Sequence, residues 1–222
     1  MSSTEVYRQR IYENEGFTAL VDLISPSHSK VLDIGCGNGA NLHLLAQRGI
    51  HGVGVTLSEA EAQIVLDRGY HAIVWDISQP DLPFPSESFD ALIFSHVLEH
   101  LPWPEEVLRR YATLLKPGGN AYIALPNVMQ FMQRWQFIRG RFRYTETGLM
   151  DRTHLRFFDS ATARQLAQNA GLHIVRFQGV GMCPMGPLRE WAPRYSRKMD
   201  RLVTRLFPGI FAFHLVLIAQ KR

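Results

Sequence analysis

The amino-acid sequence predicts an α/β fold in which a mostly parallel sheet carries helices on both faces. Two observations support this class. Short apolar runs alternate along the chain with segments whose apolar residues recur at helical spacing. A turn with glycines at positions 35, 37 and 39 follows the first apolar run. Alternation at this spacing indicates parallel βαβ units, whose ligands bind beyond the carboxyl ends of the strands.

The first half of the chain contains three expected strands. In order, the expected elements are one or two helices within residues 5–24, a strand from Val31, a helix at 40–48, a strand at 52–55, a helix from Ser58 to Gly69 and a strand at 71–75. Ser58 is a typical N-cap, and Glu61 three residues later completes a capping box. Gly49 and Gly69 mark the ends of two helices because glycine readily adopts the left-handed conformation of a helix C-terminus.

The second half continues the alternation and then changes character. The expected elements are a strand at 89–94, a helix at 104–115, a strand at 121–125, a polar and aromatic loop region at 126–159, a helix at 160–170 ended by Gly171, a strand at 173–177 and a last strand at 209–220. The Lys-Pro-Gly-Gly sequence at 116–119 ends the second of these elements. Residues 181–208 are too many for a hairpin loop, so we interpret them as a helical insertion.

Size and composition indicate one globular domain covering residues 1–222. The 222 residues are 46% hydrophobic and 20% charged, which suits a single full core. The formal net charge of +4 and the sequence pI of about 9.3 give a mild preference for anionic partners. They do not make nucleic acid the favoured partner, and the sequence leaves the oligomeric state open.

The two cysteines and the apolar runs predict a soluble, cytoplasmic protein. Cys36 and Cys183 suit a reducing compartment, and neither belongs to a metal-binding motif, so we expect no metal site. The N-terminus lacks a signal-peptide pattern. The longest apolar run, residues 209–219, is far below the ~20 residues of a membrane span.

The glycine turn is the strongest functional signal. Gly35, Gly37 and Gly39 permit a tight turn and close approach of a ligand, which indicates a nucleotide pocket. Asp33 precedes the turn, and its carboxylate would repel a pyrophosphate but could accept hydrogen bonds from a cationic amino group. The expected ligand is therefore a nucleotide with an amino-acid part, not a dinucleotide.

The run Val-Leu-Asp-Ile-Gly-Cys-Gly-Asn-Gly at residues 31–39 resembles the first motif of class I S-adenosylmethionine-dependent methyltransferases. The resemblance extends over residues 30–125. It implies a Rossmann-like, seven-stranded sheet with an antiparallel last strand and S-adenosyl-L-methionine as cofactor. It also divides the domain into an N-terminal helical cap at 1–29, a cofactor-binding core at 30–125 and an acceptor-side region at 126–222.

A dinucleotide fingerprint is the rival interpretation of the same turn. Gly35, Gly37 and Ala40 satisfy GxGxxG/A, which occurs often by chance. A dinucleotide fold also requires an acidic residue for the ribose about 20 residues later. Most members of the methyltransferase family also have an acid there, whereas this chain has Thr56, whose hydroxyl can still bond a ribose hydroxyl.

Further positions follow from the resemblance. Asp76 matches the family acid that receives the adenine amino group, and the backbone amide of Ile77 can donate to the neighbouring ring nitrogen. The alternative for Asp76 is a turn or helix cap. The residues expected to bind the cofactor are Asp33, Gly35, Cys36, Gly37, Gly39, Thr56, Leu57, Asp76, Ile77, Ser95 and His96.

Three residues are candidates for catalysis at the acceptor. If the acceptor is a hydroxyl, a base must remove its proton. We expect His154 to be this base, Asp151 to orient it from the same helical turn, and His100 to be a further candidate. Arg152 or Arg156 could hold an anionic substrate group. The alternative is that Asp151, His154 and Arg156 only fasten a loop to the sheet, and that His100 only caps a turn.

Two basic and aromatic segments have uncertain roles. Residues 128–144 could cover an acceptor pocket or form a helix that packs an apolar face on the core. Residues 187–206 could rest on an anionic membrane surface or form a solvated basic helix.

The sequence therefore predicts an enzyme that methylates an oxygen or nitrogen of a small molecule, for example a sugar or a lipid-linked metabolite. The first alternative is a non-catalytic S-adenosylmethionine-binding regulatory or assembly protein. Methylation of RNA or protein is less favoured.

Overall fold

The computed structural model describes residues 15–185 and 188–222. Its centre is a seven-stranded sheet of order β3-β2-β1-β4-β5-β7-β6. The strands are β1 (Val31–Ile34), β2 (Gly52–Thr56), β3 (His71–Val74), β4 (Phe89–Ser95), β5 (Leu115–Pro126), β6 (His173–Gly181) and β7 (Ala212–Gln220). The first five strands are parallel to one another, and β7 is antiparallel to both of its neighbours. The predicted fold class, including the antiparallel last strand, is confirmed.

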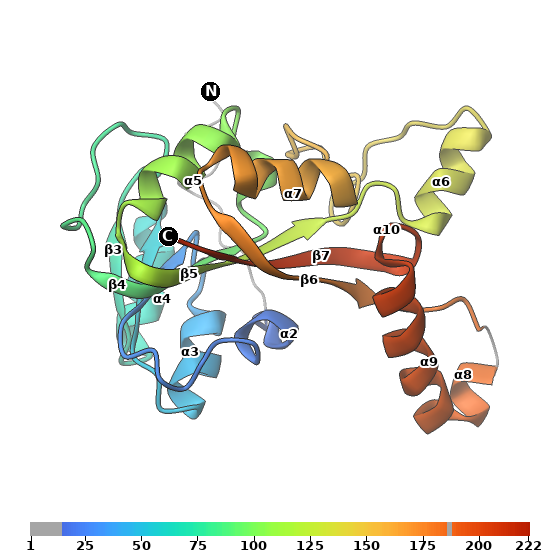
Figure 1. The fold of residues 1–222 in the computed structure, drawn as a ribbon, viewed down its shortest axis with the longest axis horizontal. Helices are drawn as coiled ribbons and strands as arrows, with labels where there is room; N and C mark the ends of the chain where they lie inside the picture. The colour runs from blue at the N-terminus through green and yellow to red at the C-terminus, as the bar shows by residue number, and fades with distance from the viewer. Residues whose placement is uncertain (1–14, 186–187) are drawn as a thin grey trace.

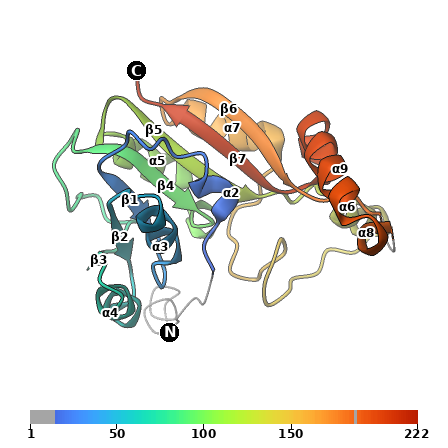
Figure 2. The same ribbon diagram turned by 90° about the horizontal axis from the view of Figure 1, so that it is seen from below.

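Helices cover both faces of the sheet (Figure 1). They are α2 (Thr18–Val21), α3 (Ala40–Gln47), α4 (Glu59–Asp67), the 3-10 helix η1 (Leu98–His100), α5 (Pro104–Ala112), α6 (Phe131–Ile138), α7 (Ser160–Asn169), α8 (Leu188–Trp191), α9 (Pro193–Leu206) and α10 (Pro208–Phe211). Helices α5 and α7 lie on one face and α2 and α3 on the other, while α6, α8 and α9 project beyond the end of the sheet (Figures 1 and 2).

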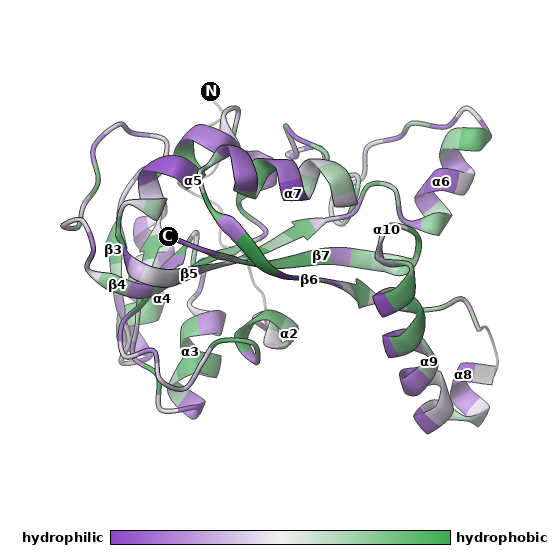
Figure 3. Ribbon diagram, viewed as in Figure 1, coloured by the Kyte–Doolittle hydropathy of each residue, from purple (hydrophilic) through white to green (hydrophobic). Residues whose placement is uncertain are grey.

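The core consists of one apolar layer on each face of the sheet. Figure 3 shows hydrophobic residues concentrated along the strands. Phe94, Tyr111 and Leu166 belong to the layer beneath α5 and α7, and Leu20 and Leu42 belong to the layer beneath α2 and α3. Burying a side chain of this size stabilises the fold by about 1.5–3 kcal/mol. The two layers fix the position of the strand ends, where the candidate site lies.

The boundaries of α4 follow local chemistry, with one difference from the sequence prediction. Ser58 caps α4, because its hydroxyl accepts from the backbone amide of Glu61 at 3.3 Å. Glu61 does not complete a capping box. Its carboxylate accepts from the Thr56 hydroxyl instead, and the Ser58 amide donates to the same Thr56 oxygen at 3.2 Å.

Several predicted elements have different lengths in the structure. Helix α5 ends at Ala112, and β5 begins at Leu115, so the Lys-Pro-Gly-Gly sequence lies inside a strand and not in a turn. Pairing of Phe89 with Leu115 at the start of β4 explains the early beginning of β5. Strand β6 extends to Gly181, and α6 lies within the expected loop region. The helical insertion is present as α8 and α9.

The N-terminal cap is described only from Glu15 onward, where it contains α2. The part of that prediction before Glu15 lies outside the described residues. Across the described ranges, none of the helices is both long and apolar enough to cross a membrane.

Candidate functional site

The glycine turn joins β1 to α3 in a left-handed backbone conformation. The φ angles are 74° at Gly35, 53° at Gly37 and 79° at Gly39. Residues other than glycine rarely adopt such positive φ angles. Space is also limited: a Cβ on Gly35 would lie 2.7 Å from a methyl carbon of Val97, in the segment after β4. The amides of Gly35 and Cys36 donate to the Val55 carbonyl at 2.8 and 2.9 Å, which fixes the turn against β2.

Asp33, at the entrance to this turn, is a buried carboxylate next to the Asn41 side chain. The residue is fully buried, and neither carboxylate oxygen has a partner among the described residues. Burial raises the pKa of Asp33 to about 7, although the Asn41 side chain opposes the rise. An unpaired buried carboxylate is costly, and a cationic ligand would offset that cost. The methionine ammonium of S-adenosylmethionine fits this requirement.

Thr56 and Glu61 form a buried pair at the end of β2. The Thr56 hydroxyl donates to a Glu61 carboxylate oxygen at 2.5 Å, and the two residues are 3% and 4% exposed. The chain therefore has an acid near the position where the family usually has one, but the acid comes from α4 and not from the strand end. Sequence reasoning treated Glu61 only as a cap, because periodicity does not show which way a helical carboxylate turns.

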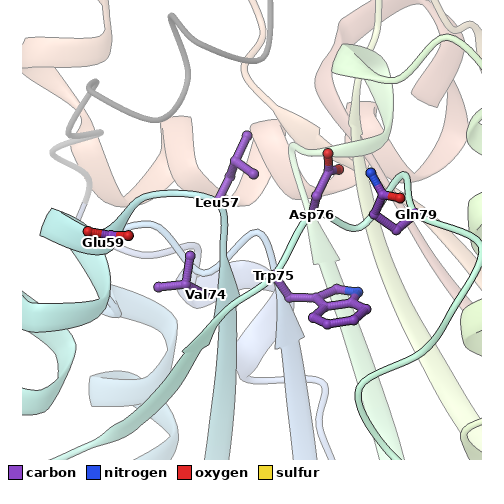
Figure 4. A pocket seen from close by; sticks show the side chains of 6 residues that line it. All are labelled: Leu57, Glu59, Val74, Trp75, Asp76 and Gln79. Atoms are coloured by element: carbon purple, nitrogen blue, oxygen red, sulfur yellow. The ribbon is translucent and has the colours of Figure 1, made fainter.

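A cavity of about 430 Å³ adjoins the ends of β2 and β3 (Figure 4). Its lining residues are Leu57, Glu59, Val74, Trp75, Asp76 and Gln79. Within the described structure, the buried indole nitrogen of Trp75 has no hydrogen-bond partner. The cavity is thus a partly polar space at the ends of two neighbouring strands, where the adenosine part of the cofactor was expected.

Asp76 has a cap role as well as its place in this cavity. Its carboxylate accepts from the amide and the hydroxyl of Ser78 at 2.9 and 2.6 Å, so the predicted alternative of a turn cap is present. The carbonyl of the next residue, Ile77, accepts from Arg110 at 3.2 Å, which fastens this loop to α5. These contacts hold the Asp76 loop in place at the cavity wall.

Cys36, Ser95 and His96 complete the expected cofactor residues. Cys36 is buried against β2, where a Cβ on Gly54 would lie 2.5 Å from its sulfur, and burial raises the pKa of the thiol. Ser95 ends β4 and pairs with Ala124. His96 has a φ of 54°, unusual for a residue with a side chain, and its Nδ1 lies 3.3 Å from a Glu99 carboxylate oxygen.

The candidate acceptor-side residues gather next to η1. The amides of Leu155 and Arg156 both donate to the Glu99 carbonyl, at 2.8 and 3.0 Å. This contact brings the ring of His154 within 4.9 Å of the ring of His100, centroid to centroid. His154 is 9% exposed, and burial lowers its pKa, so the imidazole is neutral near pH 7.

Asp151 is not arranged as the sequence suggested. Residues 151–154 form a bridge and a turn, not a helix. The Asp151 carboxylate accepts from the amide and the hydroxyl of Thr153, at 2.8 and 2.7 Å. Burial alone would raise the pKa of Asp151, but these two hydrogen bonds outweigh it and the pKa is lowered. The atom close to His154 Nδ1 is the Leu149 carbonyl oxygen, at 3.3 Å.

The two arginines of this segment have structural contacts. Arg156 donates from Nε and Nη2 to the Pro102 carbonyl, at 3.0 and 2.5 Å, and its guanidinium lies over the Trp103 ring. Arg152 forms an ion pair with Glu146. Arg156 therefore fastens the loop, as the alternative interpretation expected. The rings of His100 and His154 make an edge-to-face contact.

Glu99 is the residue of this group that sequence reasoning missed. It is 1% exposed, and its Oε2 atom has no hydrogen-bond partner within the described ranges. Burial pushes the pKa of Glu99 upward, but the hydrogen bond and charge interaction with His96 outweigh it and lower the pKa. The pattern His-x-x-Glu-His after β4 was the available signal, but only the fold shows that its acid is buried.

The two basic and aromatic segments contain α6 and α9, which project beyond one end of strands β5, β6 and β7 (Figure 1). No residue of α6 is buried, so the expectation that its apolar face packs on the core is wrong. Met132, Trp135 and Ile138 are exposed there. Helix α9 buries only Ser196 and Thr204.

The comparisons with known proteins agree with this geometry. The profile of a methyltransferase domain family matches residues 7–176. A ubiquinone biosynthesis O-methyltransferase of Stutzerimonas stutzeri is 35% identical over 112 residues, which is 47% of this chain and 47% of that protein. The chain therefore aligns with about half the length of that relative. A ubiquinone biosynthesis O-methyltransferase of Chromobacterium violaceum is 27% identical over 164 residues, 70% of this chain and 69% of that protein.

A solved structure shares the whole architecture. A SAM-dependent methyltransferase from Archaeoglobus fulgidus superposes with a TM-score of 0.67 at 21% identity, covering 99% of this chain and 95% of that chain. At this identity the likeness concerns the fold.

Proposed function

The chain belongs to the methyltransferase domain family with S-adenosylmethionine as methyl donor, and from this premise we propose that it methylates an oxygen of a small molecule. The observation that supports the methyl donor is Asp33, which is fully buried beside three glycines with positive φ. Its two carboxylate oxygens have no hydrogen-bond partner among the described residues. A cationic nucleotide with an amino-acid part satisfies both features, whereas a dinucleotide would bring its pyrophosphate toward the carboxylate.

The residues of the donor half have distinct roles in this proposal. Asp33 accepts from the ammonium group, and the turn at Gly35 lets the backbone approach the methionine part. The pair of Thr56 and Glu61 faces the ribose, and the cavity beside Asp76 takes the adenine. When bound, the cofactor supplies an electrophilic methyl group.

The acceptor half supplies the base. The Leu149 carbonyl can only accept, so Nδ1 of His154 carries the proton and Nε2 has a free electron pair. We assign Nε2 of His154 as the atom that takes the proton of an acceptor hydroxyl. His100 lies beside it and limits its orientation. Burial lowers the pKa of His154, and the charges of Glu99 and, to a smaller extent, Asp151 oppose this lowering.

An oxygen acceptor on a small molecule suits this arrangement best. Two relatives carry the name O-methyltransferase, and loss of a hydroxyl proton requires a base such as this histidine. We propose a hydroxyl of a sugar or lipid-linked metabolite as the acceptor. The exposed Trp135 and Ile138 on α6 provide apolar surface on the acceptor side of the sheet for the rest of such a molecule.

Residues 187–206 and the cysteines bear on the location of the reaction. Helix α9 exposes Arg197 and Arg201, together with Leu202, which supports peripheral contact with an anionic membrane surface. Cys36 is buried and unpaired, as is typical of a reducing cytoplasm. We propose a cytoplasmic enzyme that acts close to the membrane and does not require nucleic acid.

Incubation of the protein with methyl-labelled S-adenosylmethionine and a host extract tests this function. We expect label in a small organic-soluble or sugar-containing fraction and none in RNA or protein. His154→Ala should remove turnover and leave cofactor affinity intact, while the exposed His51→Ala serves as the control. Cofactor binding without a labelled product in any fraction would instead identify a non-catalytic binding protein.

A further inference from the structure

The side chains of Glu99, His100 and His154 form a cluster with the composition of a metal site. One potential ligand atom from each of the three residues lies within 4.8 Å of the other two. Two of these residues come from η1 and the third from the loop that hydrogen-bonds to the Glu99 carbonyl. The backbone thus holds the three side chains together, which an accidental surface cluster would not require.

The two histidines are held in the tautomer that a metal needs. Nδ1 of His154 lies 3.3 Å from the Leu149 carbonyl, and Nδ1 of His100 lies 3.2 Å from the Thr153 carbonyl. The Thr153 hydroxyl also lies 3.2 Å from His100 Nδ1, but it donates its own proton to the Asp151 carboxylate. A carbonyl oxygen only accepts, so each Nδ1 carries its proton and Nε2 is the ring nitrogen with the electron pair. Histidines that bind metals characteristically donate their other ring nitrogen to a carbonyl or carboxylate, which fixes the ring and its tautomer.

The carboxylate of Glu99 is buried and incompletely paired. It is 1% exposed, Oε1 contacts His96 Nδ1 at 3.3 Å, and Oε2 has no hydrogen-bond partner among the residues described. Among the described residues, no lysine or arginine forms an ion pair with the Glu99 carboxylate. A buried carboxylate oxygen normally has a hydrogen-bond partner or coordinates a metal ion.

We propose that Glu99, His100 and His154 bind one divalent transition-metal ion, and that this ion coordinates the oxygen of the acceptor. Two imidazoles and one carboxylate are the ligand set of open zinc sites and of facial-triad iron sites. Mg²⁺ and Ca²⁺ prefer oxygen ligands and fit this set poorly. Three protein ligands leave positions for an acceptor oxygen.

The role of the ion rests on the proposed methyl transfer to oxygen. A metal ion lowers the pKa of a bound hydroxyl, so the O–H bond breaks with the proton passing to solvent. The oxygen keeps the electron pair, which forms the new bond to the methyl carbon as the carbon–sulfur bond breaks toward sulfur. With the ion bound, Nε2 of His154 is a ligand, and the ion replaces it as the group that promotes loss of the proton.

The cluster lies close to the expected donor site. Val97, which immediately precedes η1, has a methyl carbon only 2.7 Å from where a Cβ on Gly35 would lie. His96 connects the two regions, since it follows the end of β4 and contacts Glu99. An acceptor oxygen bound to the ion would therefore lie at the same edge of the sheet as the glycine turn, where β1 and β4 end.

Metal binding is tested without turnover. The full chain is treated with a chelator, freed of it, and titrated with Zn²⁺ alone by calorimetry, and then with Co²⁺ while its visible absorption is recorded. We expect one ion per chain and the intense bands of a low-coordinate Co²⁺ site. Glu99→Gln and His154→Gln should weaken Zn²⁺ binding by roughly a hundredfold or more. Removing a group that only hydrogen-bonds to a metal ligand already lowers metal affinity by about 10–100-fold.

Matched variants control for unspecific effects. His51→Gln and Glu106→Gln change the same residue types at exposed positions and should bind Zn²⁺ as the wild type does. Equal affinity in the wild type and in Glu99→Gln would overturn the site, as would absence of stoichiometric binding. If Glu99→Gln does not fold, His100→Gln gives the same comparison, and circular dichroism decides which variants qualify.

The metal site and the donor site can be tested separately. S-adenosylmethionine affinity, measured by calorimetry on the chelated protein, reports on the donor site and should equal that of the zinc-loaded protein within about twofold. Turnover should disappear on chelation and return with Zn²⁺ or Mn²⁺. Turnover that persists in the chelated protein would overturn the metal proposal and leave His154 as the base.

Discussion

The rings of His100 and His154 lie 4.9 Å apart, centroid to centroid, although a strand and two helices separate them along the chain. Two amide hydrogen bonds to the Glu99 carbonyl hold them together, from the loop that carries His154. The acceptor-side loop is thus attached to the segment that directly follows β4. Any change in the Glu99 region should therefore affect the acceptor chemistry more than the binding of the methyl donor.

Asp33 should make the stability of the ligand-free protein fall as the pH rises from about 4 to 7. Burial raises its pKa from the ordinary 3.8 to about 7, so in this range the folded state keeps a proton that the unfolded state has lost. The folded state binds more protons, and the free energy of unfolding decreases with pH, by roughly 4 kcal/mol at most. Urea denaturation across this pH range would show the decrease, and Asp33→Asn should remove it. The same slope in both proteins would contradict this assignment.

The same substitution should weaken cofactor binding. Asp33→Asn removes the charge that the ammonium group requires, and a hydrogen bond between charged groups contributes about 1.5–3 kcal/mol, or roughly 10–150-fold in affinity. Calorimetric titration with S-adenosylmethionine at pH 8 measures this loss. Asp67→Asn on the exposed face of α4 is the matched control and should bind normally.

The sequence predicted the order of helices and strands along the chain because local signals mark each element. Ser58 caps one helix, Gly69 follows its end, and three glycines follow β1. The donor half could be assigned for the same reason, since its residues lie in a continuous motif next to strand ends. These signals depend on the backbone and are visible in a single chain.

The remaining features depend on contacts between distant residues. Glu61 turns toward Thr56 and not toward its own helix end, and Glu99 is buried beneath a loop that comes much later in the chain. The early start of β5 reflects its pairing with Phe89, which overrides the turn signal of the Lys-Pro-Gly-Gly sequence. Periodicity cannot reveal such tertiary contacts.

Removal of the Thr56 hydroxyl should destabilise the protein. In Thr56→Val, Glu61 loses its 2.5 Å hydrogen bond and the Ser58 amide loses its acceptor, all in a buried region. We expect a loss of about 1–3 kcal/mol, or roughly 3–10 °C in Tm. Thr56→Ser retains the hydroxyl and should lose much less. Thr113→Val, which removes an exposed hydroxyl, is the control, and a loss there equal to that of Thr56→Val would contradict the role of burial.

Helix α9 should bind anionic vesicles in a salt-dependent way. Its exposed Arg197 and Arg201 lie beside the exposed Leu202, and each basic residue near a charged surface contributes about 1 kcal/mol. Flotation with phosphatidylserine vesicles at low and high salt measures this. Arg197→Glu with Arg201→Glu should abolish flotation, whereas reversal of the exposed Arg141 and Arg143 should not. Equal flotation with neutral vesicles would exclude an electrostatic contact.

Gly35 should tolerate alanine only if Val97 is made smaller. Its φ of 74° alone costs alanine about 1–2 kcal/mol, and the new Cβ would also lie 2.7 Å from a Val97 methyl carbon. Gly69 is a matched control, because its φ is 80° and nothing lies within 4 Å of a Cβ there. Urea denaturation should therefore show a loss in Gly35→Ala that exceeds the loss in Gly69→Ala by about 1–3 kcal/mol. Adding Val97→Ala should recover most of this excess, since it removes the clashing methyl carbon. Additive effects of the two substitutions, within about 0.5 kcal/mol, would mean that the glycine is required only for its backbone conformation.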